Sequence, residues 1–224
     1  MPGIEAKPKG IQMKTPIARS VLTTCALFAA AFLSGCAFTK DYVALSYAPQ
    51  PNVSKIQGAE VVMVKIEVAD LRTVKDRVSV KKNGYGMEMA PIIATNDVAA
   101  LVKNAIQTEL GNRGFNCGGN TLTITAGLNK FYSDFKTGFF SASAAAEVTM
   151  NIQVKNADGS IAFSSVVAGE GANPSLQIMS GDNAKIALQA ALKDAVSKLM
   201  DDQSFIESLL KSGNKARADS SRSS

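Results

Sequence analysis

The chain has 224 residues, of which 46% are hydrophobic and 19% charged, a balance that excludes a wholly disordered protein. It contains no histidine, so the commonest general base and the commonest metal ligand are both missing. Three cysteines are too few for a disulfide scaffold or a four-thiolate zinc site. We therefore expect no metal site and no cofactor, and we assign no catalytic residue.

Residues 1–35 have the pattern of a bacterial lipoprotein signal peptide. A basic segment precedes the apolar run 21–33, which is too short to cross roughly 30 Å of hydrocarbon as a helix. The letters LSGC then end at Cys36 and resemble a lipobox, so Cys36 is the predicted lipidation site. A start at Met13 rather than Met1 would give a signal of more usual length. The alternative is a short N-terminal membrane anchor with a chance cysteine.

The net charge of +5 comes largely from this signal segment, so the mature chain is close to neutral and we expect no nucleic-acid partner. Acyl chains stabilise membrane binding by about 0.8 kcal/mol per buried CH₂, and more than one chain gives stable anchoring. The residue after Cys36 is Ala37 rather than Asp. Resemblance to enteric-type lipoprotein sorting then implies a lipid-anchored protein of the outer membrane that faces the periplasm.

The mature chain is predicted to comprise a tether, 36–58, a single α+β domain, 59–211, and a polar disordered tail, 212–224. Two prolines in the letters YAPQP favour extended backbone in the tether. An extended tether of about 22 residues at roughly 3.1 Å each would reach some 60–70 Å. Residues 43–46 within it are instead expected to form a short strand added to a sheet edge.

Alternation of apolar and polar residues predicts several half-buried strands with one apolar face each, which is typical of an antiparallel sheet. The pair Asp158-Gly159 predicts a hairpin turn between the last two of these strands. The predicted strands cover 61–69, 121–131, 148–155 and 161–167, with a weaker one over 86–93.

Apolar residues at helical spacing predict two long helices, 97–112 and 183–200, and a short C-terminal helix, 204–211. Asn96 or Thr95 is the expected N-cap of the first helix. The apolar stripes of the long helices match the apolar face of the sheet. The expected fold is therefore an α+β two-layer sandwich, with a mainly antiparallel sheet of four to five strands covered on one face by the helices.

Several segments together resemble the YajG-type envelope lipoproteins. They are the lipobox, the strand and turn VVMVKIEVADLR, the helix end ELGNRGF, the strand LTITAGLNKFYSDF and the closing KLMDDQSFIESLLK. The resemblance covers roughly residues 36–211, and the chain departs from it in its longer start, its DGS hairpin and its polar tail. It implies an outer-membrane lipoprotein with an α+β domain and supplies no catalytic residue.

Four candidate partner-binding residues lie in two segments. Asp70 and Arg72 follow the first strong strand, where an Arg fork would suit a carboxylate. The alternative is a solvated loop with local ion pairs worth about 0–1 kcal/mol. Phe139 and Phe140 belong to an aromatic-rich hairpin that would dock a partner or dip into a lipid surface, unless its rings pack beneath the helices.

Other reactive groups have simpler explanations. Cys117 lies in a glycine-rich turn, where a small buried residue is more common than a reactive thiol. Glu147, Glu170 and Asp182 would serve a hydrolase only if the fold paired them, and their spacing does not do so. Asp201 and Asp202 are expected to cap the last helix.

The sequence therefore favours a membrane-anchored, non-enzymatic interaction module with an envelope protein as its partner. The alternative is a lipid- or small-molecule-binding accessory subunit of an envelope transport system. An open cleft lined by Leu192, Val196 and Ile152 would favour that alternative, and two carboxylates close together in a pocket would favour a hydrolase.

Overall fold

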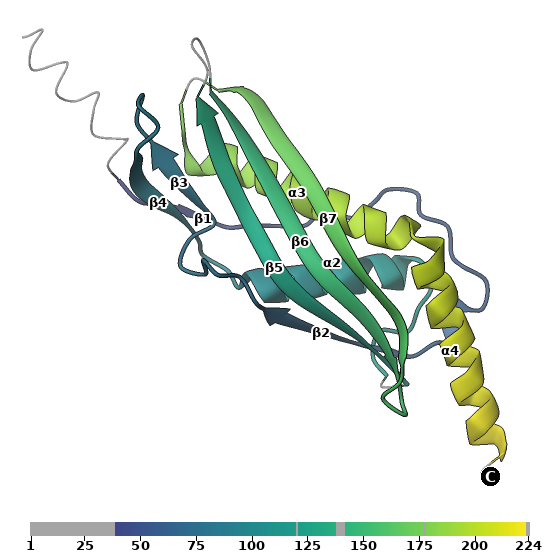
Figure 1. Ribbon diagram of the computed structural model, residues 1–224. Helices are drawn as coiled ribbons and strands as arrows, with labels where there is room; N and C mark the ends of the chain where they lie inside the picture. Colours follow the sequence, from purple (N-terminus) through teal and green to yellow (C-terminus); the bar gives the residue numbers. More distant parts are fainter. Residues whose placement is uncertain (1–38, 120, 138–141, 177, 223–224) are drawn as a thin grey trace, which may run out of the picture. The chain divides into compact units, whose positions relative to one another are not determined.

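The computed structural model describes residues 39–119, 121–137, 142–176 and 178–222. The chain divides into two compact units, Met1–Phe38 and Thr39–Ser224, and the described residues all belong to the second. Its elements (Figure 1) are β1 Asp41–Val43, the 3-10 turn η2 Ala59–Val61, β2 Val64–Asp70, β3 Ser79–Lys82, β4 Glu88–Ala94, α2 Val98–Asn112, β5 Leu122–Thr137, β6 Ala142–Asn156, β7 Ile161–Leu176, α3 Gly181–Asp201 and α4 Gln203–Arg222.

The sheet has seven strands and is mixed, where the sequence predicted four to five mainly antiparallel strands. Its order is β1-β4-β3-β5-β6-β7, and β2 also pairs with β5. β5, β6 and β7 form an antiparallel meander. β5 also pairs in parallel with β2 along Leu122–Leu128 and with β3 at Ser133. The α+β class is confirmed, whereas the strand number was wrong because the short strands β1 and β3 carry no clear alternation.

The strands of the meander are longer than predicted. In β5 the register shifts between Leu128 and Lys130, and this bulge changes which residues face the core. Leu128 is buried before the bulge, and Phe131 and Phe135 are buried after it. The aromatic segment therefore continues the strand. The Phe131 and Phe135 rings pack in the core, which agrees with the alternative that rings of this segment pack beneath the helices. The predicted turn at Asp158-Gly159 is confirmed, with Gly159 at a φ of 82°.

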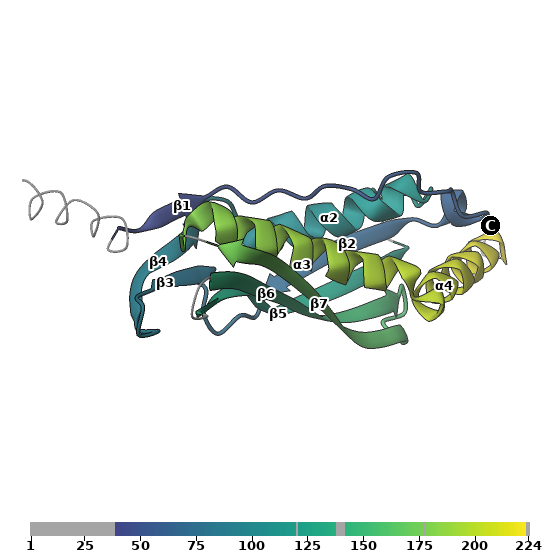
Figure 2. The same ribbon diagram turned by 90° about the horizontal axis from the view of Figure 1, so that it is seen from above.

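Helices α2 and α3 cover one face of the sheet and leave the other face open (Figure 2). α2 begins one residue later than expected, because Asp97 caps it by accepting a hydrogen bond from the Ala100 N–H. Two glycines of β7 allow α3 to lie very close. A Cβ on Gly169 would lie 2.3 Å from the Ala191 carbonyl oxygen, and one on Gly171 would lie 2.2 Å from that of Ala187.

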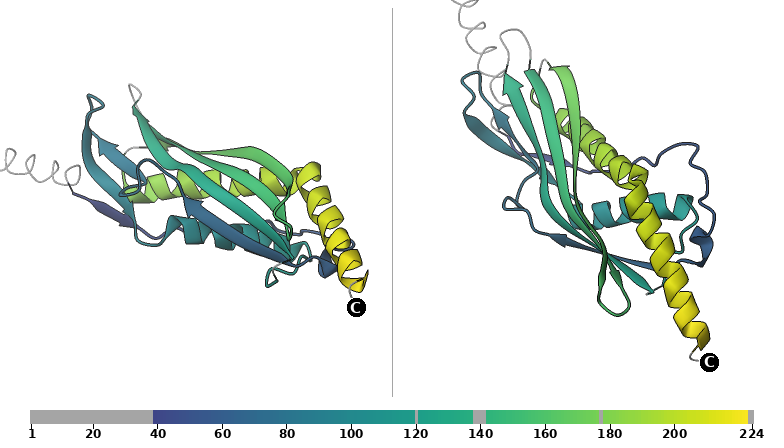
Figure 3. Two further views of the ribbon diagram at one scale, coloured as in Figure 1. Left: turned by 60° about the horizontal axis from the view of Figure 1, so that its bottom comes forward. Right: turned by 45° about the vertical axis from the view of Figure 1, so that its right-hand side comes forward.

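The C-terminal helix is much longer than the predicted 204–211. α4 follows α3 after a bend (Figure 3) and runs Gln203–Arg222, so the prediction of a disordered tail over 212–224 was wrong for residues 212–222. Asp202 caps this helix as expected, accepting from the N–H groups of Ser204 and Phe205. Gly213 lies against Val62, and this contact ties part of the polar segment to the domain.

The predicted tether is folded onto the domain over much of its length. Only Asp41–Val43 form a strand, one that pairs in parallel with β4, so the expected strand over 43–46 was wrong in its position. Val43 and Leu45 are nevertheless buried in the hydrophobic core. The backbone of Leu45 exchanges two hydrogen bonds with the Asn96 side chain. The long free reach expected for 36–58 is therefore excluded for the part after Lys40.

Candidate functional site

The open face of the meander is a surface that the helices leave uncovered. On β6 the residues alternate between buried Ala146 and Val148 and the more exposed Glu147 and Thr149. Many of the cross-strand partners on this face are polar or small, although Val166 opposite Asn151 is a 66% exposed apolar residue. They include Thr125 opposite Gln153, Thr149 opposite Ala168, and Gln153 opposite Ser164. The polar residues of the predicted alternation are thus presented to the solvent or to a partner.

A hollow of about 470 Å³ lies on this face across β5, β6 and β7. Its charged and aromatic lining residues are Lys130, Tyr132, Asp134, Lys136, Glu147 and Glu170. Lys130 donates to the Glu147 carboxylate at 2.6 Å, and the Thr149 hydroxyl donates to its other oxygen at 3.0 Å. Hydrogen bonding by Lys130 and then Thr149 holds the pKa of Glu147 below its usual value. Burial raises the pKa of Tyr132.

The fold brings together two carboxylates that the sequence spacing left apart. Glu147 and Glu170 are directly opposite each other in the β6–β7 ladder and line the same hollow. Opposed residues in a sheet have Cβ atoms about 5 Å apart, so the separation alone would suit a carboxylate hydrolase. Such an enzyme also needs one acid with a raised pKa. The lowered pKa of Glu147 makes this residue a poor proton donor.

Asp70 and Arg72 form a bidentate ion pair at the end of β2. The Arg72 Nε and Nη2 donate to the two Asp70 oxygens at 2.9 and 2.8 Å, and Arg72 is only 7% exposed. These contacts hold the pKa of the Asp70 carboxyl below its usual value. The Arg72 guanidinium, which was expected to bind a partner's carboxylate, is thus already paired with Asp70 of the same chain. Among the described residues, the Arg72 Nη1 has no hydrogen-bond partner.

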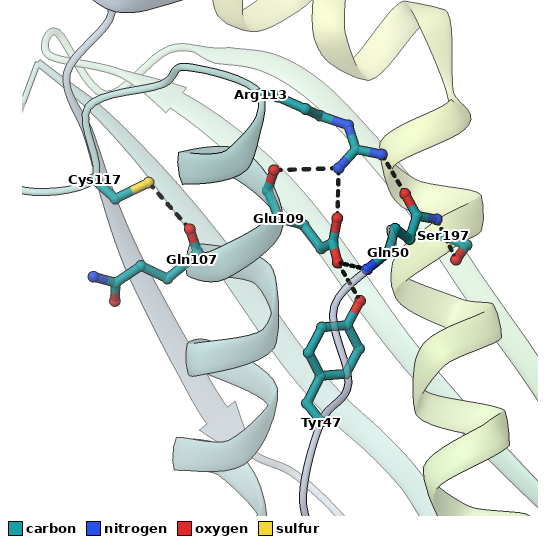
Figure 4. A network of polar contacts seen from close by, with 7 residues as sticks. All are labelled: Tyr47, Gln50, Gln107, Glu109, Arg113, Cys117 and Ser197. Carbon is teal, nitrogen blue, oxygen red and sulfur yellow. Dashed lines mark hydrogen bonds and ion pairs between the residues drawn. The ribbon is translucent and has the colours of Figure 1, made fainter. Parts of the chain in front are cut away.

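A buried polar network, which sequence reasoning missed, fixes the segment 44–50 onto α2 and α3 (Figure 4). Glu109 is fully buried and accepts from Arg113, from the Tyr47 hydroxyl at 2.8 Å and from the Gln50 N–H at 2.8 Å. The Gln50 side chain bridges Arg113 and Ser197. Burial, and then the hydrogen bond to Glu109, raises the pKa of Tyr47 far above its usual range. Glu109 falls on the apolar stripe of α2, which is the signal that could have revealed it.

Cys117 is half-buried across α2 from this network (Figure 4), and burial raises the pKa of its thiol. The Sγ atom lies 3.6 Å from the Gln107 carbonyl oxygen. A raised pKa disfavours the thiolate, so this cysteine matches the structural role expected from its glycine-rich turn.

The residues expected to line an apolar ligand cleft are core residues. Leu192, Val196 and Ile152 are each fully buried, so no opening to solvent lies at these positions. Within the part of the chain that the structure describes, no cluster of three or more acidic or cysteine residues could hold a metal ion. None of the described helices is long and apolar enough to cross a membrane. Cys36, Phe139 and Phe140 lie outside the described residues.

Several solved structures resemble this fold at low identity. A protein from Xanthomonas campestris has 12% identity and a TM-score of 0.49, covering 72% of this chain and 92% of that one. A minor lipoprotein from Acinetobacter baumannii has 8% identity and a TM-score of 0.41, covering 66% and 93%. A protein described as a lipoprotein from Caulobacter crescentus has 11% identity and a TM-score of 0.37, covering 72% and 94%. These scores are too low to support an argument about function.

The sequence comparisons give a family. No curated protein matches the chain. A family described as "uncharacterized lipoprotein" matches residues 49–209, which is more than two thirds of the chain. The matched segment begins just before the Gln50 contacts of the buried network and ends within α4. The chain therefore belongs to this family of uncharacterised bacterial lipoproteins.

Proposed function

We propose that this lipoprotein is a non-enzymatic interaction module, anchored through Cys36 to the outer membrane and facing the periplasm. The observation that carries the proposal is the open face of the β5–β6–β7 meander. Both long helices pack on the opposite face, so nothing among the described residues covers this one (Figure 2). A sheet face left this open is available for a partner protein.

The chemistry of the open face suits recognition of a polar protein surface. Its charges are of both signs, because Lys130 and Lys136 lie near Asp134 and Glu147 around the hollow. The Lys130–Glu147 ion pair is half-exposed on both sides. Complementary charges of this kind increase the association rate and the specificity of a complex more than its affinity.

Site-specific photo-cross-linking in intact cells tests the proposal. A photoreactive residue at Thr149 is expected to capture one defined envelope protein. The same residue at Ile186 is expected to capture none, because Ile186 is exposed on α3 at the helical side of the domain. The Lys130→Glu variant should weaken the Thr149 cross-link, whereas the control Lys193→Glu on α3 should not. Equal cross-linking from both positions, or none from either, would contradict the proposal.

A further inference from the structure

The hairpin between β3 and β4 presents apolar side chains that the fold does not use. Tyr85 at its tip is 91% exposed and Met87 is 58% exposed. The turn is closed by its own bonds, since the Asn83 Oδ1 accepts from the N–H groups of Tyr85 and Met87. Gly86 has a φ of 81°, which suits this tight turn. The Tyr85 ring is therefore displayed to the surroundings rather than needed for folding.

The strand directions show where the preceding chain is heading. β1 is parallel to β4, with Asp41 opposite Ile92. β4 starts at the hairpin, so the N-terminal end of β1 points towards the hairpin tip. Five residues separate Ile92 from Met87, which corresponds to about 16 Å at roughly 3.3 Å per residue. The hairpin tip thus lies up to about this far along β4 from Ile92, at the end of the sheet where the chain enters the domain.

The chain that connects Cys36 to the domain is short. Cys36 and Asp41 are five residues apart, and a fully extended chain spans at most about 3.3–3.6 Å per residue, so this connection reaches at most about 17 Å. The maximum reach of the anchor and the projection of the hairpin are therefore nearly equal. The lipid on Cys36 therefore keeps the hairpin tip within reach of the bilayer, because the connecting chain can extend barely further than the hairpin does.

Two more exposed apolar residues lie at this end of the domain. Tyr42 in β1 is 65% exposed, and Ile178 just before α3 is 67% exposed. The start of α3 is fixed beside β1, because the Gly181 N–H donates to the Asp41 carboxylate at 2.7 Å. The start of α3 and the β3–β4 hairpin lie at the same end of the sheet (Figure 1). The exposed Lys40 adds a positive charge next to β1.

We propose that this end of the domain, defined by Tyr42, Tyr85, Met87 and Ile178, rests on the phospholipid surface that holds the anchor. The inference depends on Cys36 being the lipidated residue. Tyrosine suits such a surface, because its ring is apolar and its hydroxyl remains at the level of the headgroups. Contact with lipid orients the domain, so that the open face of the meander extends away from the bilayer rather than turning freely.

Tryptophan fluorescence tests the contact directly, since the chain contains no tryptophan of its own. The lipidated protein is reconstituted into phosphatidylethanolamine–phosphatidylglycerol vesicles with and without brominated acyl chains. Tyr85→Trp is expected to show a blue-shifted emission that brominated lipid quenches several-fold more than it quenches Ile161→Trp. Ile161 is a matched control, because it is 56% exposed and begins β7 beside the opposite hairpin.

The outcomes separate the contact from the anchor. If the lipidated protein sediments with the vesicles but Tyr85→Trp is quenched no more than Ile161→Trp, the membrane contact is overturned and the anchor stands. If the protein does not sediment with the vesicles, the anchor itself is overturned, and the contact that depends on it falls as well. Selective quenching of Tyr85→Trp supports both.

Discussion

Arg113 donates a hydrogen bond of 2.6 Å to the carboxylate of Glu109, and the Glu109 side chain is completely buried. The pair is separated by one turn of α2, and it reaches the segment 44–50 through Tyr47 and Gln50 (Figure 4). The ion pair therefore holds the N-terminal segment on the domain. This contact leaves only a short connection between Cys36 and the folded part of the chain.

Removal of the Glu109 carboxylate is expected to destabilise the protein strongly. Glu109→Ala leaves a buried guanidinium unpaired, which typically costs about 3–5 kcal/mol of unfolding free energy. Urea denaturation followed by circular dichroism measures the loss. The control Glu207→Ala removes an exposed pair with Lys211 and should leave the unfolding midpoint unchanged. Equal midpoints for the two variants would show that the buried network does not stabilise the domain.

The Tyr47 hydroxyl should make stability depend on alkaline pH. Its folded-state pKa is raised, so its stabilising contribution is complete below the unfolded pKa near 10 and is lost as the pH rises through the higher folded value. Tyr47→Phe removes a hydrogen bond to a charged group and should cost about 1–2 kcal/mol near neutral pH. The difference in unfolding free energy between the natural chain and Tyr47→Phe should shrink between about pH 8 and about pH 11. A constant difference would contradict the raised pKa.

Periodic segments were predictable, and the reasons for the misses are local. The helix over 97–112 and the start of β5 follow from regular spacing of apolar residues. The bulge after Leu128 changes the phase of alternation, so counting by twos stops there. In β6, Ala142–Ala146 are small or polar and give no alternation, although they pair with β7 throughout. β3 was missed because it buries a lysine, which sequence reasoning assigns to the solvent. The buried Lys81 is paired with Asp41, which is 40 residues away in the sequence.

The polar contacts were less predictable than the elements. The prolines near Gln50 suggested a free extended tether, and its bonds to Glu109 connect residues 59 or more apart in the sequence. No local pattern encodes such a contact. The pairing of Glu147 with Glu170 likewise depends on the strand register, which the DGS turn and the register shift near Lys155 set together. The proximity of Asp70 and Arg72 was predictable, because they are two residues apart.

A side chain at Gly169 should force α3 away from the sheet. The added Cβ would lie 2.3 Å from the backbone oxygen of Ala191, and backbone cannot yield as a flexible side chain can. Gly169→Ala should therefore lower the unfolding free energy by about 1–3 kcal/mol or more, as overpacking does. Gly111→Ala is the matched control, since Gly111 lies in α2 with open space around its Cβ position. Gly111→Ala should raise the unfolding free energy slightly. A similar loss of unfolding free energy in both variants would refute the close packing of α3 on Gly169.

The Asp70–Arg72 pair should contribute to stability above acidic pH. The Asp70 pKa is lowered in the fold, so its contribution is present above the unfolded value near 3.9 and is lost as the pH falls through the folded value. Asp70→Asn removes the charge from a bidentate pair and should cost about 2 kcal/mol near neutral pH. Thermal unfolding at a series of pH values measures both effects. If the natural chain and Asp70→Asn lose stability in parallel on acidification, Asp70 is not the responsible group.

Cys36→Ala should separate the anchor from the fold. The variant lacks the thiol that would carry the diacylglycerol, so we expect an unprocessed chain without palmitate label. The described residues hold their own hydrophobic core, and the purified variant should therefore unfold at the same temperature as the natural protein. Metabolic labelling with palmitate and fractionation of the two membranes measure lipidation and location together. Cys117→Ala is the control for loss of a thiol and should retain both the label and the outer-membrane location, because that cysteine lies within the folded domain. Palmitate labelling that persists in Cys36→Ala would refute the predicted lipidation site.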